Sequence, residues 1–286
     1  MAAVRLAMGA TIVDMSNQRV ALVTGASSGV GQATARLLSA RGYKVFGTSR
    51  NAAGAGSTPG VELLALDVRA DDSVRACVEA VAARGGRLDV LINNAGYELA
   101  GALEEVSLQE ARDQFETNFF GVVRMINAAL PVMRRQKSGH IVNVSSLAGL
   151  SPIPFMGFYS ASKFAVEGYT EALRHEVKPF NIHVSLLEPA FLKTPMMSHR
   201  QVGANRIADY DLWRQRALDA IRAQEAKAPE AGQVAARLLE IVSAKPPRLR
   251  YLFGQQARLI TRLRWILPPG LYELGVRRTF YLDKGQ

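Results

Sequence analysis

Short apolar segments alternate with segments of helical pattern along most of the chain, and this alternation restricts the possible folds more than any other feature. Apolar runs that predict strands occupy residues 19–24, 44–49, 61–66, 88–92, 140–144 and 182–187. Helical patterns lie between or after them at residues 32–41, 71–84, 119–135 and 157–178, with a further helix opened by the capping box at 107–110. Alternating strands and helices form a parallel sheet with right-handed crossovers and helices on both faces. We therefore expect a doubly wound α/β domain that binds its ligands beyond the carboxyl ends of the strands.

The composition agrees with a single large α/β domain in a reducing compartment. The chain has 286 residues, of which 48% are hydrophobic. Its one cysteine, Cys77, excludes an internal disulfide framework and lies in an Ala/Val-rich helical stretch, where a small buried thiol is expected. The sequence contains no run of about 18 apolar residues, the length that a membrane-spanning helix needs. We predict a cytoplasmic protein.

We divide the chain into three parts. Residues 1–18 read as a flexible leader, since their apolar stretch is too weak for a signal peptide. We expect residues 19–254 to form one α/β domain and residues 255–286 to form a basic amphipathic extension. Within the domain, residues 192–227 are expected to cover a substrate or, alternatively, to pack as a helical flap. The residues available for that cover are Met196, Met197, Tyr210, Leu212 and Trp213.

The net charge of +10 is concentrated at the C-terminal end. Residues 245–286 contain nine Lys and Arg residues against Glu273 and Asp283, which places +7 of the +10 in this segment. A nucleic-acid-binding module would spread its basic residues over the domain and interleave aromatic ones. We therefore exclude nucleic acid as a partner.

A glycine-rich turn follows the first predicted strand and precedes the first predicted helix. It reads TGASSGVG over residues 24–31. Gly25 would permit the tight turn, Gly29 the close approach of backbone to a pyrophosphate, and Gly31 the packing of helix on strand. The helix N-terminus offers free N–H groups to phosphates. We expect the whole turn, including Ser27, Ser28 and Val30, to bind a dinucleotide.

The end of the second predicted strand indicates which dinucleotide. A site for NAD usually has an acidic residue there, which accepts a hydrogen bond from the ribose 2′-hydroxyl. Here no carboxylate is present, and Ser49 is followed by Arg50, whose guanidinium suits a 2′-phosphate. The sequence predicts NADP(H) as the cofactor. The alternative is that Arg50 is only a solvated loop charge.

Tyr159 and Lys163 lie at positions i and i+4 of a predicted helix and so share one face. A free tyrosine has a pKa of about 10, too high for efficient proton transfer near neutral pH. A neighbouring ammonium favours the phenolate and lowers that pKa. We expect this pair to act as a general acid/base, although the same spacing also occurs by chance.

The motifs at residues 24–31, Asn93–Gly96, Asn118, the IVNVSS run ending at Ser146, and Tyr159/Lys163 stand in an order that resembles the short-chain dehydrogenase/reductase family. The resemblance covers about residues 19–250. It implies a Rossmann-type doubly wound sheet in a single domain, here with a C-terminal helical extension. It also implies a homodimer or homotetramer.

The resemblance implies catalytic roles for four residues. Tyr159 would donate or accept the proton at the substrate oxygen, and Ser146 would hydrogen-bond that oxygen, with Ser145 less favoured by its spacing. Lys163 would bind the ribose hydroxyls of the nicotinamide nucleotide and lower the pKa of Tyr159. Asn118 would hold a water that links Lys163 to solvent.

The resemblance also implies further cofactor contacts, beside the adenine, along the adenosine and at the nicotinamide. These residues are Asp67, Val68, Asn94, Ala95, Gly96, Pro189 and Thr194. The family usually has Pro-Gly after the sixth strand, whereas this chain has Pro189-Ala190, so backbone freedom beside the nicotinamide is reduced. Glu188 reads as a solvated charge at the strand end. The four histidines lack partners at ligand spacing, and we expect no metal.

The substrate side is less constrained. The segment Pro246–Leu252 weakly resembles the branch with oestradiol 17β-dehydrogenases and photoreceptor-type retinol dehydrogenases, which suggests an apolar steroid-, retinoid- or lipid-like alcohol or carbonyl. A catalytically silent NADP-binding regulator would typically have lost one of the four catalytic residues, and all are present. Residues 255–267 form a basic amphipathic pattern that suits packing on the protein or a subunit partner, or else peripheral membrane contact.

Overall fold

The protein's structure, a computed structural model, describes residues 18–54, 56–193, 200–254 and 256–283. The predicted leader except Gln18, and also Thr194, Met196 and Met197, lie outside these ranges. Among the described residues, no helix has the length and apolar character needed to cross a membrane.

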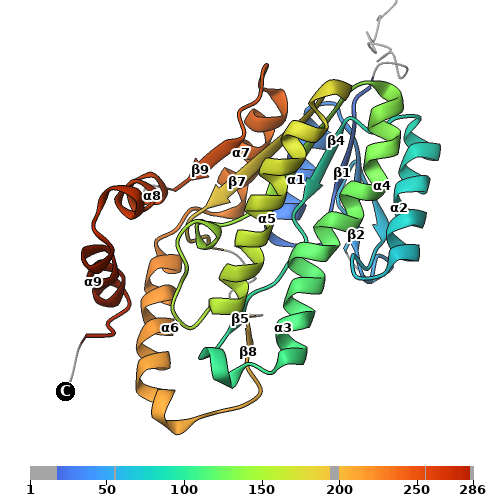
Figure 1. The fold of residues 1–286 in the computed structure, drawn as a ribbon. Coiled ribbons are helices and arrows are strands. Elements are labelled where there is room, and N and C mark those ends of the chain that lie inside the picture. The colour runs from blue at the N-terminus through green and yellow to red at the C-terminus, as the bar shows by residue number, and fades with distance from the viewer. Residues whose placement is uncertain (1–17, 55, 194–199, 255, 284–286) are drawn as a thin grey trace, which may run out of the picture.

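A seven-stranded, wholly parallel sheet forms the centre of the molecule, in the order β3-β2-β1-β4-β6-β7-β9 (Figure 1). The predicted doubly wound α/β fold is therefore confirmed. The strands are β1 (Val20–Val23), β2 (Lys44–Ser49), β3 (Val61–Ala65), β4 (Val90–Asn93), β6 (Gly139–Val144), β7 (Ile182–Pro189) and β9 (Arg250–Phe253).

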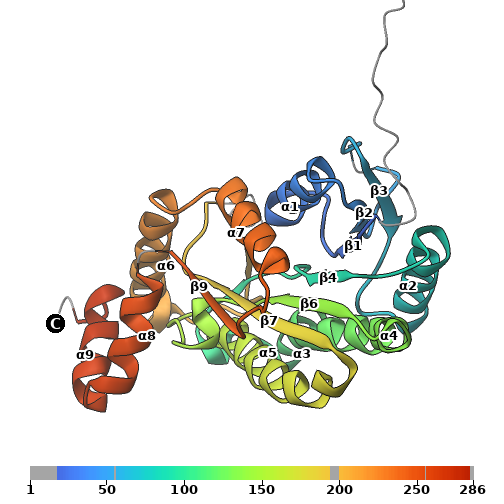
Figure 2. The ribbon, with the colours of Figure 1, turned by 90° about the horizontal axis from the view of Figure 1, so that it is seen from above.

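Helices cover both faces of the sheet (Figure 2). On one face lie α1 (Gly29–Ala40) and α7 (Ala231–Ser243), and on the other α2 (Asp71–Gly85), α3 (Leu108–Phe115), α4 (Gly121–Gln136) and α5 (Gly157–Glu176). Alternate side chains of a strand enter different cores: Leu22 packs with α2, α4 and α5, whereas Ala21 and Val23 pack with α1 and α7. Burial of both faces explains why the strands read as continuous apolar runs.

Helix α4 shows how the sequence pattern positions an element. Its buried residues are Gly121, Val122, Met125, Ile126, Ala129 and Met133, at the three- and four-residue spacing of an amphipathic helix. The predicted capping box opens α3: the Ser107 hydroxyl accepts a hydrogen bond from the Glu110 amide, and the Glu110 carboxylate accepts one from the Ser107 amide. Cys77 is buried in α2, as predicted.

Two predicted helix starts need correction, and one strand was missed. Helix α1 begins at Gly29, so the glycine turn runs directly into the helix. The helix predicted from residue 119 begins at Gly121, because a single π-helical turn, Glu116–Phe120, joins α3 to α4. Strand β9 was not predicted, since its short segment Arg250–Phe253 lacks both a long apolar run and an alternating pattern.

Elements outside the main sheet gather beyond its carboxyl edge. A small parallel sheet pairs β5 (Leu99–Ala100) with β8 (Gln201–Val202). Helix α6 (Asp211–Ala226) lies beside it, whereas α8 (Ala257–Ile266) and α9 (Pro269–Thr279) lie farther out, on the β9 side of the molecule (Figure 1). The C-terminal segment returns to the domain at Phe280, which is buried in one cluster with Tyr159 and four residues of α6.

Helix α8 has two different sides. Arg264 donates a hydrogen bond to the carbonyl of Leu150 and lies over the ring of Phe164, at 5.2 Å from its centroid. On the other side Leu259, Trp265 and Ile266 are 58%, 84% and 75% exposed. The predicted packing on the protein therefore describes only one side of this helix.

Glu188 is completely buried, which corrects the prediction of a solvated charge. The Arg250 guanidinium forms ion pairs with Glu188 of β7 and with Glu167 and Glu171 of α5. Burial and the neighbouring Glu167 raise the pKa of Glu188 to about 8. Burial also raises the pKa of Glu167. Two carboxyl groups so close together and so poorly solvated favour the sharing of one proton.

We predict that this cluster makes stability depend on pH. The folded protein holds the pKa of Glu188 at about 8, above the ordinary 4.5, so the fold favours the protonated carboxyl. That contribution is fully present below the unfolded pKa and is lost as pH rises through the folded pKa. Urea unfolding should therefore give a free energy that falls between about pH 5 and pH 8, and Glu188→Gln should flatten the fall. Glu240→Gln, at an exposed site of α7, is the control. An unchanged profile in Glu188→Gln would refute the assignment.

Candidate active site

One continuous cavity of about 1040 Å³ opens at the carboxyl edge of the sheet. It extends from the glycine turn after β1, past the ends of β2, β3, β4, β6 and β7, to α8 and α9. Every predicted catalytic residue lines it. So do the predicted cofactor residues Gly25, Ser27, Ser28, Gly29, Val30, Ser49, Arg50, Asp67, Val68, Asn94, Ala95, Gly96 and Pro189. Gly31 is buried and does not line the cavity, and Thr194 lies outside the described residues.

The glycine turn has the backbone geometry that its glycines allow. Gly25 and Gly29 have φ angles of +67° and +55°, in the region that other residues rarely adopt. A Cβ on Gly31 would lie 2.2 Å from the carbonyl oxygen of Gly25, so only glycine permits this approach of α1 to the turn. No side chain caps the described N-terminus of α1, and its first turn carries no acidic residue. The turn therefore presents N–H groups and a positive helix end to the cavity.

The end of β2 combines a structural hydroxyl with an exposed cation. Thr48 is buried, and its hydroxyl accepts a hydrogen bond from the amide of Gly25 at 3.3 Å. Arg50 is exposed at the cavity rim, and Arg69, after β3, is a second exposed guanidinium on the same rim. The sequence reasoning did not single out Thr48 or Arg69. Thr48 belongs to the ordinary pattern of strand β2 and Arg69 to a loop, so nothing in the sequence pattern marks either residue.

Thr24 links the ends of β1 and β4. Its hydroxyl accepts hydrogen bonds from the amides of Asn94 and Ala95 at 2.9 and 3.0 Å. The Asn94 side chain donates back to the Thr24 carbonyl at 3.0 Å. The segment that would contact the adenosine is thus held against the phosphate turn by side-chain hydrogen bonds. At the end of β4, the Asn93 side chain donates a hydrogen bond to the Asn143 side chain of β6 at 2.8 Å.

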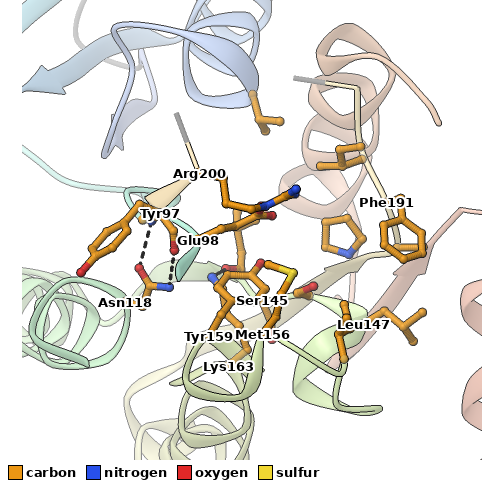
Figure 3. Close-up of a pocket in the computed structure, with 18 of the residues that line it drawn as sticks. Tyr97, Glu98, Asn118, Ser145, Leu147, Met156, Tyr159, Lys163, Phe191 and Arg200 are labelled. Carbon is orange, nitrogen blue, oxygen red and sulfur yellow. Dashed lines mark hydrogen bonds and ion pairs between the residues drawn. The ribbon is translucent and has the colours of Figure 1, made fainter. Parts of the chain in front are cut away.

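Asn118 is buried in the single π-helical turn, a distortion often found at functional sites. Its side chain brackets the backbone of Tyr97, accepting from the amide at 3.1 Å and donating to the carbonyl at 3.0 Å (Figure 3). A Cβ on Gly96 would lie 3.0 Å from the Asn118 amide oxygen. These contacts fix the loop after β4 against α3 and α4.

Tyr159 and Lys163 lie on the first turns of α5 and face the cavity together (Figure 3). The Lys163 ammonium donates to the carbonyl of Val144 at 2.9 Å and lies 5.9 Å from the centroid of the Tyr159 ring. Ser146 accepts a hydrogen bond from the amide of Ala148 and interacts with the Tyr159 hydroxyl. The sequence order therefore brings the predicted serine, tyrosine and lysine onto one wall.

The electrostatics of Tyr159 differ from the prediction that Lys163 lowers its pKa. Burial raises the pKa of Tyr159, because the phenolate would be poorly solvated. Glu98 and Glu225 raise it further, while Ser146 and Arg200 oppose them. Burial lowers the pKa of Lys163 to about 8, with Glu167 and Glu98 opposing this shift. For the pKa of Tyr159, the burial of the phenol thus outweighs the expected effect of the Lys163 ammonium.

The departure at Pro189-Ala190 is accommodated by a neighbouring strand. The Ala190 amide donates to the carbonyl of Phe253 at 2.9 Å, which continues the pairing of β7 with β9. Gly254 has a φ of +107°, and a Cβ there would lie 3.1 Å from the Ala190 methyl. The extra methyl at residue 190 therefore fits beside a glycine.

The substrate side is built from residues that the sequence reasoning mostly did not name. The predicted covering residues Tyr210, Leu212 and Trp213 do not line the cavity, and Leu212 is 52% exposed. Helix α6 presents Ile221 and Glu225 instead. The C-terminal helices contribute an apolar wall composed of Ile260, Leu263, Leu267, Leu271 and Val276. Glu98 and Arg200 complete the side nearest Tyr159 (Figure 3).

Comparison with known proteins agrees with this arrangement. The short chain dehydrogenase family profile matches residues 19–204. A 3-ketodihydrosphingosine reductase from Bacteroides thetaiotaomicron is 41% identical over 262 residues, covering 91% of this chain and 97% of that protein. Retinol dehydrogenase 8 from Bos taurus is 43% identical over 183 residues, covering 60% of this chain and 58% of that protein.

Solved structures share the whole fold. A short-chain dehydrogenase from Streptomyces avermitilis superposes with a TM-score of 0.78 at 31% identity, over 94% of this chain and 99% of that one. A short-chain dehydrogenase/reductase from Burkholderia phymatum in complex with NAD gives 0.75 at 30% identity, over 87% and 93%. The actinorhodin polyketide ketoreductase with NADPH gives 0.72 at 30% identity, over 84% and 97%. The chain belongs to the short-chain dehydrogenase/reductase family and is an oxidoreductase of alcohol and carbonyl groups that uses a nicotinamide cofactor.

Proposed function

We propose that this enzyme uses NADP(H) to interconvert a secondary or primary alcohol and its carbonyl in an apolar, lipid-like substrate. The observation that carries the proposal is the shared wall of Ser146, Tyr159 and Lys163 in one cavity with the glycine turn. Two relatives are named for 3-ketodihydrosphingosine and for retinol, which supports an apolar substrate. The apolar face of α8 and α9 supports it independently.

The residues present fit a nicotinamide dinucleotide. The uncapped N-terminus of α1 and the left-handed Gly25 and Gly29 form a cradle for a pyrophosphate. Arg50 would bind the 2′-phosphate, and no acidic residue at the end of β2 competes for that place. Asp67 and Val68 would contact the adenine, and Pro189 and Thr194 the nicotinamide. When bound, the cofactor supplies or accepts a hydride.

The chain's own residues then control the proton and the geometry. Ser146 would hold the substrate oxygen by a hydrogen bond, and Tyr159 would give that oxygen its proton during reduction. Lys163 would hold the ribose hydroxyls and place a positive charge near the phenol. The loop fixed by Asn118 would keep the cofactor side of the cavity rigid, and Asn118 would hold the water that supplies protons from solvent.

The outer side of the C-terminal helices suits contact with an anionic lipid surface, and we include this peripheral contact in the proposal. It mixes exposed apolar residues with exposed arginines. The apolar ones are Leu259, Trp265, Ile266 and Leu274, and the arginines are Arg258, Arg262, Arg277 and Arg278. Such a surface gains both apolar burial and electrostatic attraction at an anionic membrane. The inner side of the same helices lines the cavity, so an apolar substrate would have a short path from the lipid surface into the cavity.

Replacing Tyr159 by Phe should lower kcat by about 10²–10⁴-fold, because the proton donor is lost while the ring remains. NADPH binding, measured by fluorescence titration, should persist. Tyr169→Phe, at a half-buried tyrosine further along α5, is the matched control. A kcat within a few-fold of the wild type for any accepted substrate would exclude Tyr159 as the proton donor.

Replacing Arg50 by Ala should weaken NADPH binding about tenfold or more, because a charge-assisted phosphate contact is lost. NADH binding should change little, since NADH lacks the 2′-phosphate. Arg36→Ala makes the same charge change at an exposed position of α1. Calorimetric titrations that give equal affinities for NADPH and NADH in the wild type would refute the phosphate site.

Wild-type protein should co-sediment with vesicles of phosphatidylcholine and phosphatidylserine, and the binding should fall as salt is raised. The double change Trp265→Ser and Ile266→Ser should reduce binding, because the most exposed apolar side chains are lost. Leu108→Ser removes a 71% exposed leucine elsewhere and should have no effect. If binding is absent while sedimentation shows a dimer that the double change disrupts, the surface is a subunit contact instead.

A further inference from the structure

Helix α9, at the outer end of the molecule, presents one continuous face to the cavity (Figure 2). The residues of this face that line the cavity are Leu271, Tyr272, Gly275, Val276 and Thr279. They follow the three- and four-residue spacing of one side of a helix. The structure describes α9 over its whole length, and the residues on its other side do not line the cavity. The wall that α9 forms therefore has its smallest residue, Gly275, at its centre.

Contacts on both sides of Gly275 fasten this face to the domain. The hydroxyls of Tyr272 and Ser151 hydrogen-bond to each other, which ties α9 to the loop after β6. Phe280, directly after the helix, is buried in the cluster that contains Tyr159. Gly275 lies between these two contacts in the chain. Its place beside the cavity is therefore fixed by tertiary structure and does not depend on α9 alone.

The backbone does not require a glycine at residue 275. Gly275 lies inside a regular helix. A Cβ on it would meet no atom of the described residues within 4 Å, apart from its chain neighbours and the backbone of its own helix. Glycine inside a helix is less stable than alanine, because its backbone loses more conformational freedom on folding. The missing side chain therefore weakens the helix and leaves open space in front of it.

This space joins the cavity to the outside of the molecule. Gly275 and Thr279 are exposed and Leu271 is 56% exposed, although all three line the cavity. The apolar side chains that α8 contributes to the same cavity are partly buried. None of the charged residues of α9, a helix described in full, lines it. An opening with apolar borders and no side chain at its centre suits an apolar chain that extends out of the cavity.

We propose that Gly275 forms a port through which the apolar chain of the substrate leaves the cavity, and that this residue determines which chain lengths the enzyme accepts. The inference rests on the proposed function and concerns the accepted length of the substrate. The reacting carbon would lie at Tyr159. The chain would run along α8 and pass over Gly275, between Leu271 and Thr279. A large side chain at residue 275 would close the port and turn the open channel into a pouch of limited depth.

An open port and a closed pouch differ in how kcat/KM depends on chain length. Each methylene that moves from water onto the apolar wall favours binding by up to about fourfold. In the wild type, kcat/KM should rise while the added carbons lie in the cavity. It should then level off, because further carbons pass through the port into solvent. With the port closed, kcat/KM should rise at first and then fall at the chain length that reaches residue 275.

The test measures kcat/KM for linear methyl ketones of increasing chain length, with NADPH and NADH both in excess and the ketones delivered from cyclodextrin. Dividing the value for a variant by the wild-type value for the same ketone removes differences in solubility. For Gly275→Leu this ratio should fall with chain length, to about one tenth or less for the longest ketones. Gly275→Ala should give a smaller fall. Gly270→Leu, on the same helix, also places its side chain in open space but does not line the cavity, so its ratio should stay constant.

The outcomes separate the port from the proposed function. Gly275→Leu should not lower the melting temperature, because leucine favours a helix more than glycine does. A ratio that is the same for all chain lengths would overturn the port, since a structural defect lowers the reduction of every ketone alike. A wild-type kcat/KM that drops sharply beyond one chain length would also overturn it, because the cavity would then already be closed. Both results leave the proposed oxidoreductase intact. If the wild type reduces no ketone of the series, the proposed function itself fails.

Discussion

The common direction of the strands in the main sheet determines where the proposed cofactor and catalytic residues of this enzyme lie. Because the strands run in one direction, their carboxyl ends meet at one edge, and the loops that follow them converge there. Thr24 strengthens this convergence by bonding the turn after β1 to the loop after β4. The Gly31 contact with Gly25 then sets the angle at which α1 leaves the edge. The phosphate turn is thus positioned by strand direction and by two contacts, one between Gly31 and Gly25 and one between Thr24 and Asn94, which is 70 residues away in sequence.

Much of the fold and many of the candidate site residues could be predicted from the sequence, because their signals are local. Gly25, Gly29 and Gly31 lie within seven residues, and Tyr159 and Lys163 lie one helical turn apart. Each signal depends on spacing along a single element. Once strands alternate with helices, topology alone brings these elements to the same edge.

The parts that could not be predicted depend on partners far away in the sequence. Glu188 looked like a surface charge because its counterion, Arg250, stands 62 residues later in a strand that has no clear pattern. Glu98 and Arg200 are 102 residues apart and meet only through a two-residue sheet. The same limit applies to Tyr159. Its neighbour Lys163 was expected to lower its pKa, but burial by segments far away in the sequence raises it instead.

Phe280 connects the C-terminal segment to the catalytic wall, because it packs in the same hydrophobic cluster as Tyr159 although 121 residues separate them. The groups proposed for proton transfer all precede α6, whereas the apolar wall of the cavity follows β9. The residues proposed for proton transfer and the apolar wall of the cavity are therefore encoded in separate stretches of the chain. Recombination or design could exchange the last thirty or so residues for those of a relative and alter the accepted carbon skeleton. The graft would need to retain an aromatic ring at the position of Phe280 to close the core beneath the tyrosine.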